Sequence, residues 1–228
     1  MKLIGNYFSP YVRRVAIGLN SVGLKYELEE LYVFQNSERV RKYNPVTRVP
    51  ALVLDDGETI VESSAILDEI DELVGPTRAL APPNGKSRRR VIQMTALAMV
   101  CTEKARWSFY EKRFRPAGLV HHPWIEHNER QVLDGFAVLD GKLAKRDQDC
   151  WIADTETISR ADITTAVGFT FANTVCSHLR LKPRFEFLGR FVERCEQLKC
   201  FRDAKLPETG PKRELDRLLS STPSSDAL

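Results

Sequence analysis

This chain of 228 residues has no long apolar run and no cysteine before position 101. A membrane-spanning helix needs about 20 consecutive, mostly apolar residues, and no stretch approaches that length. Residues 1–6 turn polar too soon for a secretory signal peptide. We therefore expect a cytoplasmic protein without a membrane partner.

The chain also lacks paired cysteines and any strong excess of one charge. Its cysteines are odd in number and form no tight pairs, which argues against a disulfide framework and against a zinc site. The histidines at 121, 122 and 127 do not have the spacing of metal ligands either, so we expect no metal. The net charge of +3 is too small to indicate a nucleic-acid partner. The five cysteines are Cys101, Cys150, Cys176, Cys195 and Cys200.

Strand and helix signals alternate through residues 1–76. Ser9 is a favourable N-cap, Pro10 suits the first helical position, and apolar residues then recur with helical spacing. Asp55-Asp56-Gly57 is a strong hairpin turn. The pattern predicts a βαβαββα domain with strands over 3–7, 26–31, 51–54 and 59–61, and helices over 10–22, 38–42 and 63–74.

The second half has only helical signals. A Pro- and Gly-rich stretch over 77–86 indicates a linker, and an all-helical domain is expected over 87–206, followed by a partly disordered tail over 207–228. Ser159-x-x-Asp162 is a capping box. The helix that follows it has no charged residue, so we expect it at the domain centre. The expected helices cover 87–115, 125–143, 163–177 and 185–198.

Two short strings suggest a binding site. Asn44-Pro45-x-x-Arg48-Val49-Pro50 reads as a turn entering a strand, with a proline that implies a bend, an edge or a cis peptide bond. Glu62-Ser63 stands just ahead of an apolar helical stripe, and a helix N-terminus attracts anions. A strand edge beside a helix N-terminus is suited to a small peptide that ends in a carboxylate.

These motifs, in this order and in these two domains, resemble the cytosolic glutathione transferase family over nearly the whole chain. The string Ser9-Pro10-Tyr11-Val12-Arg13-Arg14 is similar to the start of the serine-type classes (tau, phi and theta) and of related bacterial members. The resemblance implies a thioredoxin-like glutathione-binding domain followed by an all-α domain, in a homodimer.

The resemblance also implies roles for particular residues. Ser9 would donate a hydrogen bond to the thiolate of glutathione, and Tyr7 is the alternative donor. Val49 would pair with the cysteinyl backbone, next to a cis Pro50 that keeps this edge open. Glu62 would bind the γ-glutamyl ammonium and Ser63 its carboxylate. Arg48 either faces the glycyl carboxylate or is a solvated surface residue.

A second substrate would bind between the domains, at Tyr11, Arg106, Trp107 and Tyr110, with Phe114 as a further candidate. The expected activity is a transferase that conjugates glutathione, its co-substrate, to hydrophobic electrophiles in detoxification. A glutathione-dependent dehalogenase or peroxidase, or a non-catalytic binding module of the same fold, stays open as an alternative.

Overall fold

A computed structural model of the protein describes residues 1–147 and 149–206. The described chain forms two compact units, Met1–Gly75 together with residues 203–206, and Pro76–Arg202. The tail expected over 207–228 lies outside the described residues. The return of residues 203–206 to the first unit was not expected, because the sequence pattern placed them in the helical domain.

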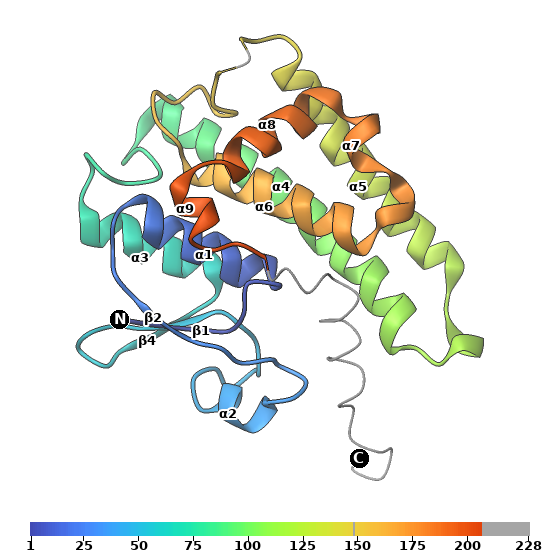
Figure 1. Ribbon diagram of the computed structural model, residues 1–228, viewed down its shortest axis with the longest axis horizontal. Coiled ribbons are helices and arrows are strands. Elements are labelled where there is room, and N and C mark those ends of the chain that lie inside the picture. Colours follow the sequence, from blue (N-terminus) through green and yellow to red (C-terminus); the bar gives the residue numbers. More distant parts are fainter. Residues whose placement is uncertain (148, 207–228) are drawn as a thin grey trace. The chain divides into compact units, whose positions relative to one another are not determined.

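The first unit contains a four-stranded mixed sheet with the order β2-β1-β3-β4 (Figure 1). β1 pairs parallel to β2, whereas β1–β3 and β3–β4 are antiparallel. The β3–β4 hairpin turns at Asp55-Asp56-Gly57, where Gly57 has a φ of +92°. The strands are β1 (Lys2–Ile4), β2 (Glu27–Glu29), β3 (Ala51–Val53) and β4 (Thr59–Val61).

Helices cover both faces of this sheet, with α1 and α3 on one side and α2 on the other (Figure 1). Ile4 and Ala51 pack with Val40 of α2 in one apolar cluster. Because side chains alternate along a strand, Leu3 and Leu52 face the opposite side, where α1 packs against α3. This arrangement confirms the thioredoxin-like fold. The helices are α1 (Pro10–Ser21), α2 (Ser37–Arg41) and α3 (Ser63–Val74).

The first strand is shorter than predicted. It ends at Ile4 instead of residue 7, because Gly5 has a φ of +131° and turns the chain out of the sheet. A Cβ on Gly5 would lie 2.5 Å from Val12 Cγ2 and 3.0 Å from Val49 Cβ. Gly5 therefore lets the end of β1, the start of α1 and the segment before β3 approach one another closely.

The second unit is helical, as predicted. α6 is buried over nearly its whole length and packs against α4 and α8, and its capping box joins Ser159 and Asp162. α5 and α6 each begin three residues earlier than expected, and α7 and α9 were not predicted. The helices are α4 (Gly85–Phe114), α5 (His122–Leu143), α6 (Arg160–Val175), α7 (Leu181–Arg184), α8 (Glu186–Glu196) and α9 (Lys199–Arg202), with 3₁₀ turns η1 (Ala117–Leu119) and η2 (Ser177–Leu179).

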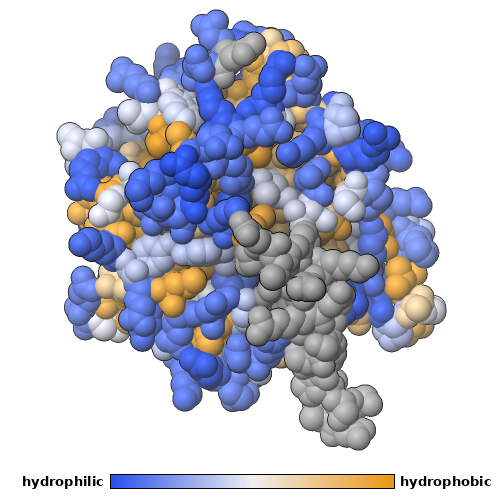
Figure 2. Space-filling view, in the orientation of Figure 1, coloured by the Kyte–Doolittle hydropathy of each residue, from blue (hydrophilic) through white to orange (hydrophobic). Residues whose placement is uncertain are grey.

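The surface drawn in Figure 2 is mostly hydrophilic, with apolar side chains in small separate groups. Within the described residues, the helices are all too short or too polar to cross a bilayer.

Candidate functional site

The loop between β1 and α1 is organised by the side chain of Asn6, which is buried. Asn6 Oδ1 accepts hydrogen bonds from the backbone N–H groups of Phe8 (3.1 Å) and Ser9 (3.4 Å). Its Nδ2 donates to the Leu31 carbonyl at 3.1 Å. Asn6 thus ties the loop that carries Ser9 to the chain beyond β2. Sequence analysis missed this residue, although an asparagine ahead of a helix N-cap is a common turn signal.

Ser9 is the N-cap of α1, as predicted. Its Oγ accepts a long hydrogen bond of 3.5 Å from the Val12 N–H. No described residue accepts a hydrogen bond from the Ser9 hydroxyl, and the side chain is only half-buried. The hydroxyl therefore caps the helix with a lone pair while its proton stays available.

Tyr7, the alternative donor, is engaged elsewhere. Its hydroxyl lies 2.8 Å from the Tyr26 hydroxyl. Burial, followed by this hydrogen bond, raises the pKa of Tyr26 far above its usual range. Arg13, a member of the string that begins at Ser9, is buried and donates through Nε to the Ala204 carbonyl at 3.0 Å. Arg13 therefore holds residue 204 against α1.

The segment before β3 presents the backbone of Val49. The Val49–Pro50 peptide bond is cis, as the resemblance implied. Asn44, which is buried, accepts from the Val46 N–H through Oδ1 and donates through Nδ2 to the Arg48 carbonyl, both at 3.1 Å. No described residue forms a hydrogen bond with the backbone of Val49. Both its N–H and C=O are thus free to pair with a ligand.

The N-terminus of α3 has an unusual backbone conformation. Glu62, its N-cap, has φ of +69° and ψ of 125° and makes no side-chain capping bond. A non-glycine residue in such a sparsely populated region costs about 1–3 kcal/mol, and such residues cluster at functional sites. Ser63 follows at the first helical position and is buried. Its Oγ accepts from Arg14 Nη1 at 3.2 Å.

Arg48 lies beside Glu62, with 3.9 Å between Arg48 Nη1 and Glu62 Oε1. Its guanidinium carbon is also 6.0 Å from the centre of the Tyr11 ring. The structure thus places Arg48 near both Glu62 and Tyr11. The resemblance had assigned these three residues to the glycyl carboxylate, the γ-glutamyl ammonium and the second substrate, respectively. Tyr11 itself is buried.

The remaining candidates for the second substrate lie in the helical unit, on α4. The Arg106 guanidinium carbon is 4.7 Å from the Trp107 ring centre and 5.0 Å from the Tyr110 ring centre. Arg106 Nε also donates to Glu103 Oε2 at 3.1 Å. Phe114 meets Tyr110 edge to face at 5.1 Å. The four side chains form one arginine–aromatic cluster, in which Trp107 is exposed.

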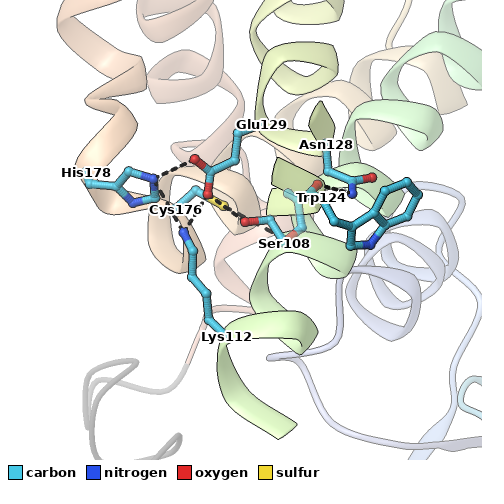
Figure 3. A network of polar contacts seen from close by, with 8 residues as sticks. Ser108, Lys112, Trp124, Asn128, Glu129, Cys176 and His178 are labelled. Carbon is cyan, nitrogen blue, oxygen red and sulfur yellow. Dashed lines mark hydrogen bonds and ion pairs between the residues drawn. The ribbon is translucent and has the colours of Figure 1, made fainter. Parts of the chain in front are cut away.

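A polar network that sequence analysis missed joins α4, α5 and η2 (Figure 3). Glu129 Oε1 accepts from Ser108 Oγ at 2.6 Å and from Lys112 Nζ at 2.5 Å. Glu129 Oε2 accepts from His178 Nε2 at 2.9 Å. Burial raises the pKa of Glu129, but hydrogen bonds from Lys112, Ser108 and His178 outweigh it, so the pKa is lowered overall. The carboxylate is therefore ionised at neutral pH.

A thioredoxin-like sheet with a serine at the first helix N-terminus, followed by a helical unit, defines a class of two-domain proteins with a thioredoxin-like first domain. Comparison with known proteins narrows this class. Residues 3–78 match the model of the glutathione S-transferase N-terminal domain. The uncharacterised GST-like protein YibF of Escherichia coli is 29% identical over 74% of this chain and 81% of its own length. Glutathione S-transferase U7 of Arabidopsis thaliana is 36% identical, but over only 32% of each chain.

Solved structures extend the similarity over both units. A glutathione S-transferase of Methylobacterium radiotolerans, in complex with glutathione sulfonate, is 27% identical with a TM-score of 0.81, over 89% of this chain and 93% of that one. One from Methylobacillus flagellatus with bound glutathione is 26% identical with a TM-score of 0.82, over 90% and 99%. Together, the match of the first unit to the N-terminal domain and the similarity of both units to solved glutathione S-transferases support a member of the cytosolic glutathione transferase family.

Proposed function

We propose that this protein is a glutathione transferase in which Ser9 activates the thiol of glutathione for attack on electrophilic small molecules. The observation that supports this role is the hydrogen bonding of the Ser9 hydroxyl. This hydroxyl stands at the N-terminus of α1, accepts its capping bond from Val12 and gives its own proton to no described residue. Such a hydroxyl is ready to donate to an incoming thiolate.

The energy required matches one such hydrogen bond. A free thiol has a pKa of about 8.5, so little thiolate exists at neutral pH. Lowering that pKa by about two units requires about 2.7 kcal/mol. A hydrogen bond to a charged acceptor contributes about 1.5–3 kcal/mol, and the dipole of α1 adds to it. Ser9 would stabilise the thiolate and would not itself be the nucleophile.

The rest of glutathione would lie along the two strings found in the sequence. The free N–H and C=O of Val49, beside Pro50, would pair with its cysteinyl residue as an added strand pairs with a sheet edge. Glu62 would bind the γ-glutamyl ammonium, and Ser63 its carboxylate. Arg48 lies at the same end, beside Glu62, so this geometry supports a contact with the γ-glutamyl group more than one with the glycyl carboxylate.

The electrophile would be an apolar molecule. Within the helical unit, the proposed contacts are Arg106, Trp107 and Tyr110, because a partly exposed aromatic cluster around a cation suits a flat ring that bears electron-withdrawing groups. Within the first unit, Tyr11 keeps this role as a candidate, with its ring against Arg48. Mutation of Trp107 to Ala should raise the KM for an aromatic electrophile and leave the affinity for glutathione unchanged.

A homodimer is part of the proposal. On α4, the exposed residues Ile92 and Val100 flank Ala96 at helical spacing and form an apolar stripe. We expect wild type to sediment as a dimer and Val100→Glu to sediment as a monomer. A monomeric wild type at micromolar concentration would contradict this expectation.

We also propose a cytoplasmic location and a role in detoxification. The five cysteines are not joined in disulfide bonds, which agrees with a reducing compartment, where disulfides are rare. Cell fractionation with the intact protein checks the location, and survival of a deletion strain on toxic electrophiles checks the role.

The test of the function is calorimetric titration with reduced glutathione, with the ultraviolet absorbance of bound thiolate read against pH. Wild type, Ser9→Ala and Tyr7→Phe are compared. We expect all three to bind and only Ser9→Ala to lose thiolate at neutral pH. Loss of thiolate in Tyr7→Phe alone would transfer the role to Tyr7. No binding by wild type would instead favour a non-catalytic binding module.

A further inference from the structure

Arg14 is a fully buried cation in the same helix as Ser9. Only 1% of it is exposed. Its Nη1 lies 3.2 Å from Ser63 Oγ and 3.5 Å from Ser64 Oγ, so the guanidinium reaches from α1 to the first turn of α3. The geometry of this contact determines which group donates.

A guanidinium group has only donors, whereas a serine hydroxyl both donates and accepts. Ser63 Oγ must therefore accept the hydrogen bond from Arg14, and its own proton must point elsewhere. No described residue accepts that proton. The side chain of Glu62 does not cap α3 either, so the N–H groups of the first turn also lack a capping side chain.

We propose that Arg14 is a positioning residue for the carboxylate of the γ-glutamyl group. By occupying a lone pair of Ser63 Oγ, Arg14 directs the Ser63 hydroxyl proton away from itself, so that this proton can donate to an anion beside the uncapped N–H groups of α3. This inference rests on the proposed function. It adds that one helix, α1, serves both ends of the ligand, with Ser9 at the thiol and Arg14 behind the carboxylate site.

The experiment compares two ligands by calorimetry. One is glutathione and the other is 4-aminobutyryl-cysteinylglycine, which lacks only the γ-glutamyl carboxylate. In Arg14→Met, we expect glutathione to bind about tenfold more weakly, as for the loss of one hydrogen bond that involves a charged group. The affinity for the analogue should stay within about twofold, because the analogue does not use the oriented hydroxyl. Arg14→Lys should recover part of the loss.

Ser64→Ala is the matched control, because Ser64 is exposed and receives the longer contact. It should bind both ligands as wild type does. Equal losses for both ligands in Arg14→Met would overturn the inference, because Arg14 would then only support packing. If wild type bound neither ligand, the proposed function itself would fail.

A double-mutant cycle keeps the inference testable if Arg14→Met does not fold. Because Arg14 acts through Ser63, Arg14→Lys should weaken glutathione binding in the wild-type background and cause no further loss in Ser63→Ala. Equal losses in both backgrounds would overturn it.

Discussion

Asn6 uses both ends of its side-chain amide to shape the loop that carries Ser9. Asn6→Ala removes the side-chain acceptor of the Phe8 and Ser9 N–H groups, whereas the Ser9 N–H keeps its hydrogen bond of 3.1 Å to the Asn6 carbonyl. We expect the pKa of the bound thiol to rise, because the Ser9 hydroxyl would no longer be held in one place, and the free energy of unfolding to fall by about 1–3 kcal/mol. A pH titration of thiolate absorbance measures the first effect.

Asn36→Ala is the control for that prediction, because Asn36 Oδ1 accepts from the Tyr32 N–H at 3.0 Å in a similar turn before α2. It should lower stability without changing the thiol pKa. An equal rise of the thiol pKa in both variants would show that Asn6 acts through general stability and not through Ser9.

At the scale of the elements, glycines set how closely the long helices approach. A Cβ on Gly168 of α6 would lie 2.3 Å from Thr102 Oγ1 of α4, and one on Gly135 of α5 would lie 2.3 Å from Cys101 Sγ. Thr102 cannot easily move, because its hydroxyl donates to the Ala98 carbonyl at 2.8 Å and its side chain is β-branched.

Gly168→Ala should therefore destabilise the protein, by about 1–3 kcal/mol, as overpacking in a core does. Gly141→Ala in α5 is the control, because nothing lies within 4 Å of a Cβ there. That variant should gain about 0.5–1 kcal/mol from helix propensity. Urea denaturation of both variants measures the difference, and a gain of stability in Gly168→Ala would contradict the close contact.

The Glu129 network predicts a pH dependence of stability. The pKa of Glu129 is lowered in the folded protein, where Lys112, Ser108 and His178 outweigh the effect of burial. The stabilisation is therefore fully present above the unfolded-state pKa of about 4.3 and is lost as the pH falls through the folded-state value. Glu129→Gln should cost about 1–3 kcal/mol at pH 7.

Urea denaturation at neutral and acidic pH checks this prediction. The difference between wild type and Glu129→Gln should shrink on acidification. Glu126→Gln, an exposed carboxylate on the same helix, should stay within about 0.5 kcal/mol of wild type at both pH values. A pH-independent cost in Glu129→Gln would assign the effect to packing alone.

At the scale of the whole molecule, all five cysteines lie in the helical unit, so their reactivity measures the unfolding of that unit alone. Burial raises the pKa of Cys101 to about 12 and that of Cys176 to about 11, and it raises the pKa of Cys195 well above its usual value. Cys150 and Cys200 are partly exposed. An alkylating reagent at neutral pH should therefore modify Cys150 and Cys200 first.

The three buried thiols should react only as the helical unit unfolds. Mass spectrometry of alkylated peptides at increasing urea concentration measures the unfolding of the helical unit. Loss of glutathione binding over the same urea range measures the unfolding of the first unit, which has no cysteine. We expect Cys101, Cys176 and Cys195 to become reactive together. Early labelling of Cys101 would show that α4 opens separately.

Much of this protein is determined locally by its sequence. Ser9 and Pro10 start α1, Asp55-Asp56-Gly57 turns the hairpin, and the Ser159–Asp162 box starts α6. Each signal acts within a few residues, because caps and turns satisfy nearby backbone groups. Periodicity and these signals therefore predicted the order of the elements and the fold class.

Only the tertiary structure decided which distant residues meet. Arg14 contacts a serine 49 positions away, and Arg13 reaches a carbonyl 191 positions away. The Glu129 network draws on three separate elements. No local pattern encodes such contacts, because a buried polar group bonds to whatever partner packing brings near it. The sequence alone thus proposed Ser9, Val49, Glu62 and Ser63 as ligand contacts, whereas only the packing of α1 against α3 placed Arg14 beside Ser63.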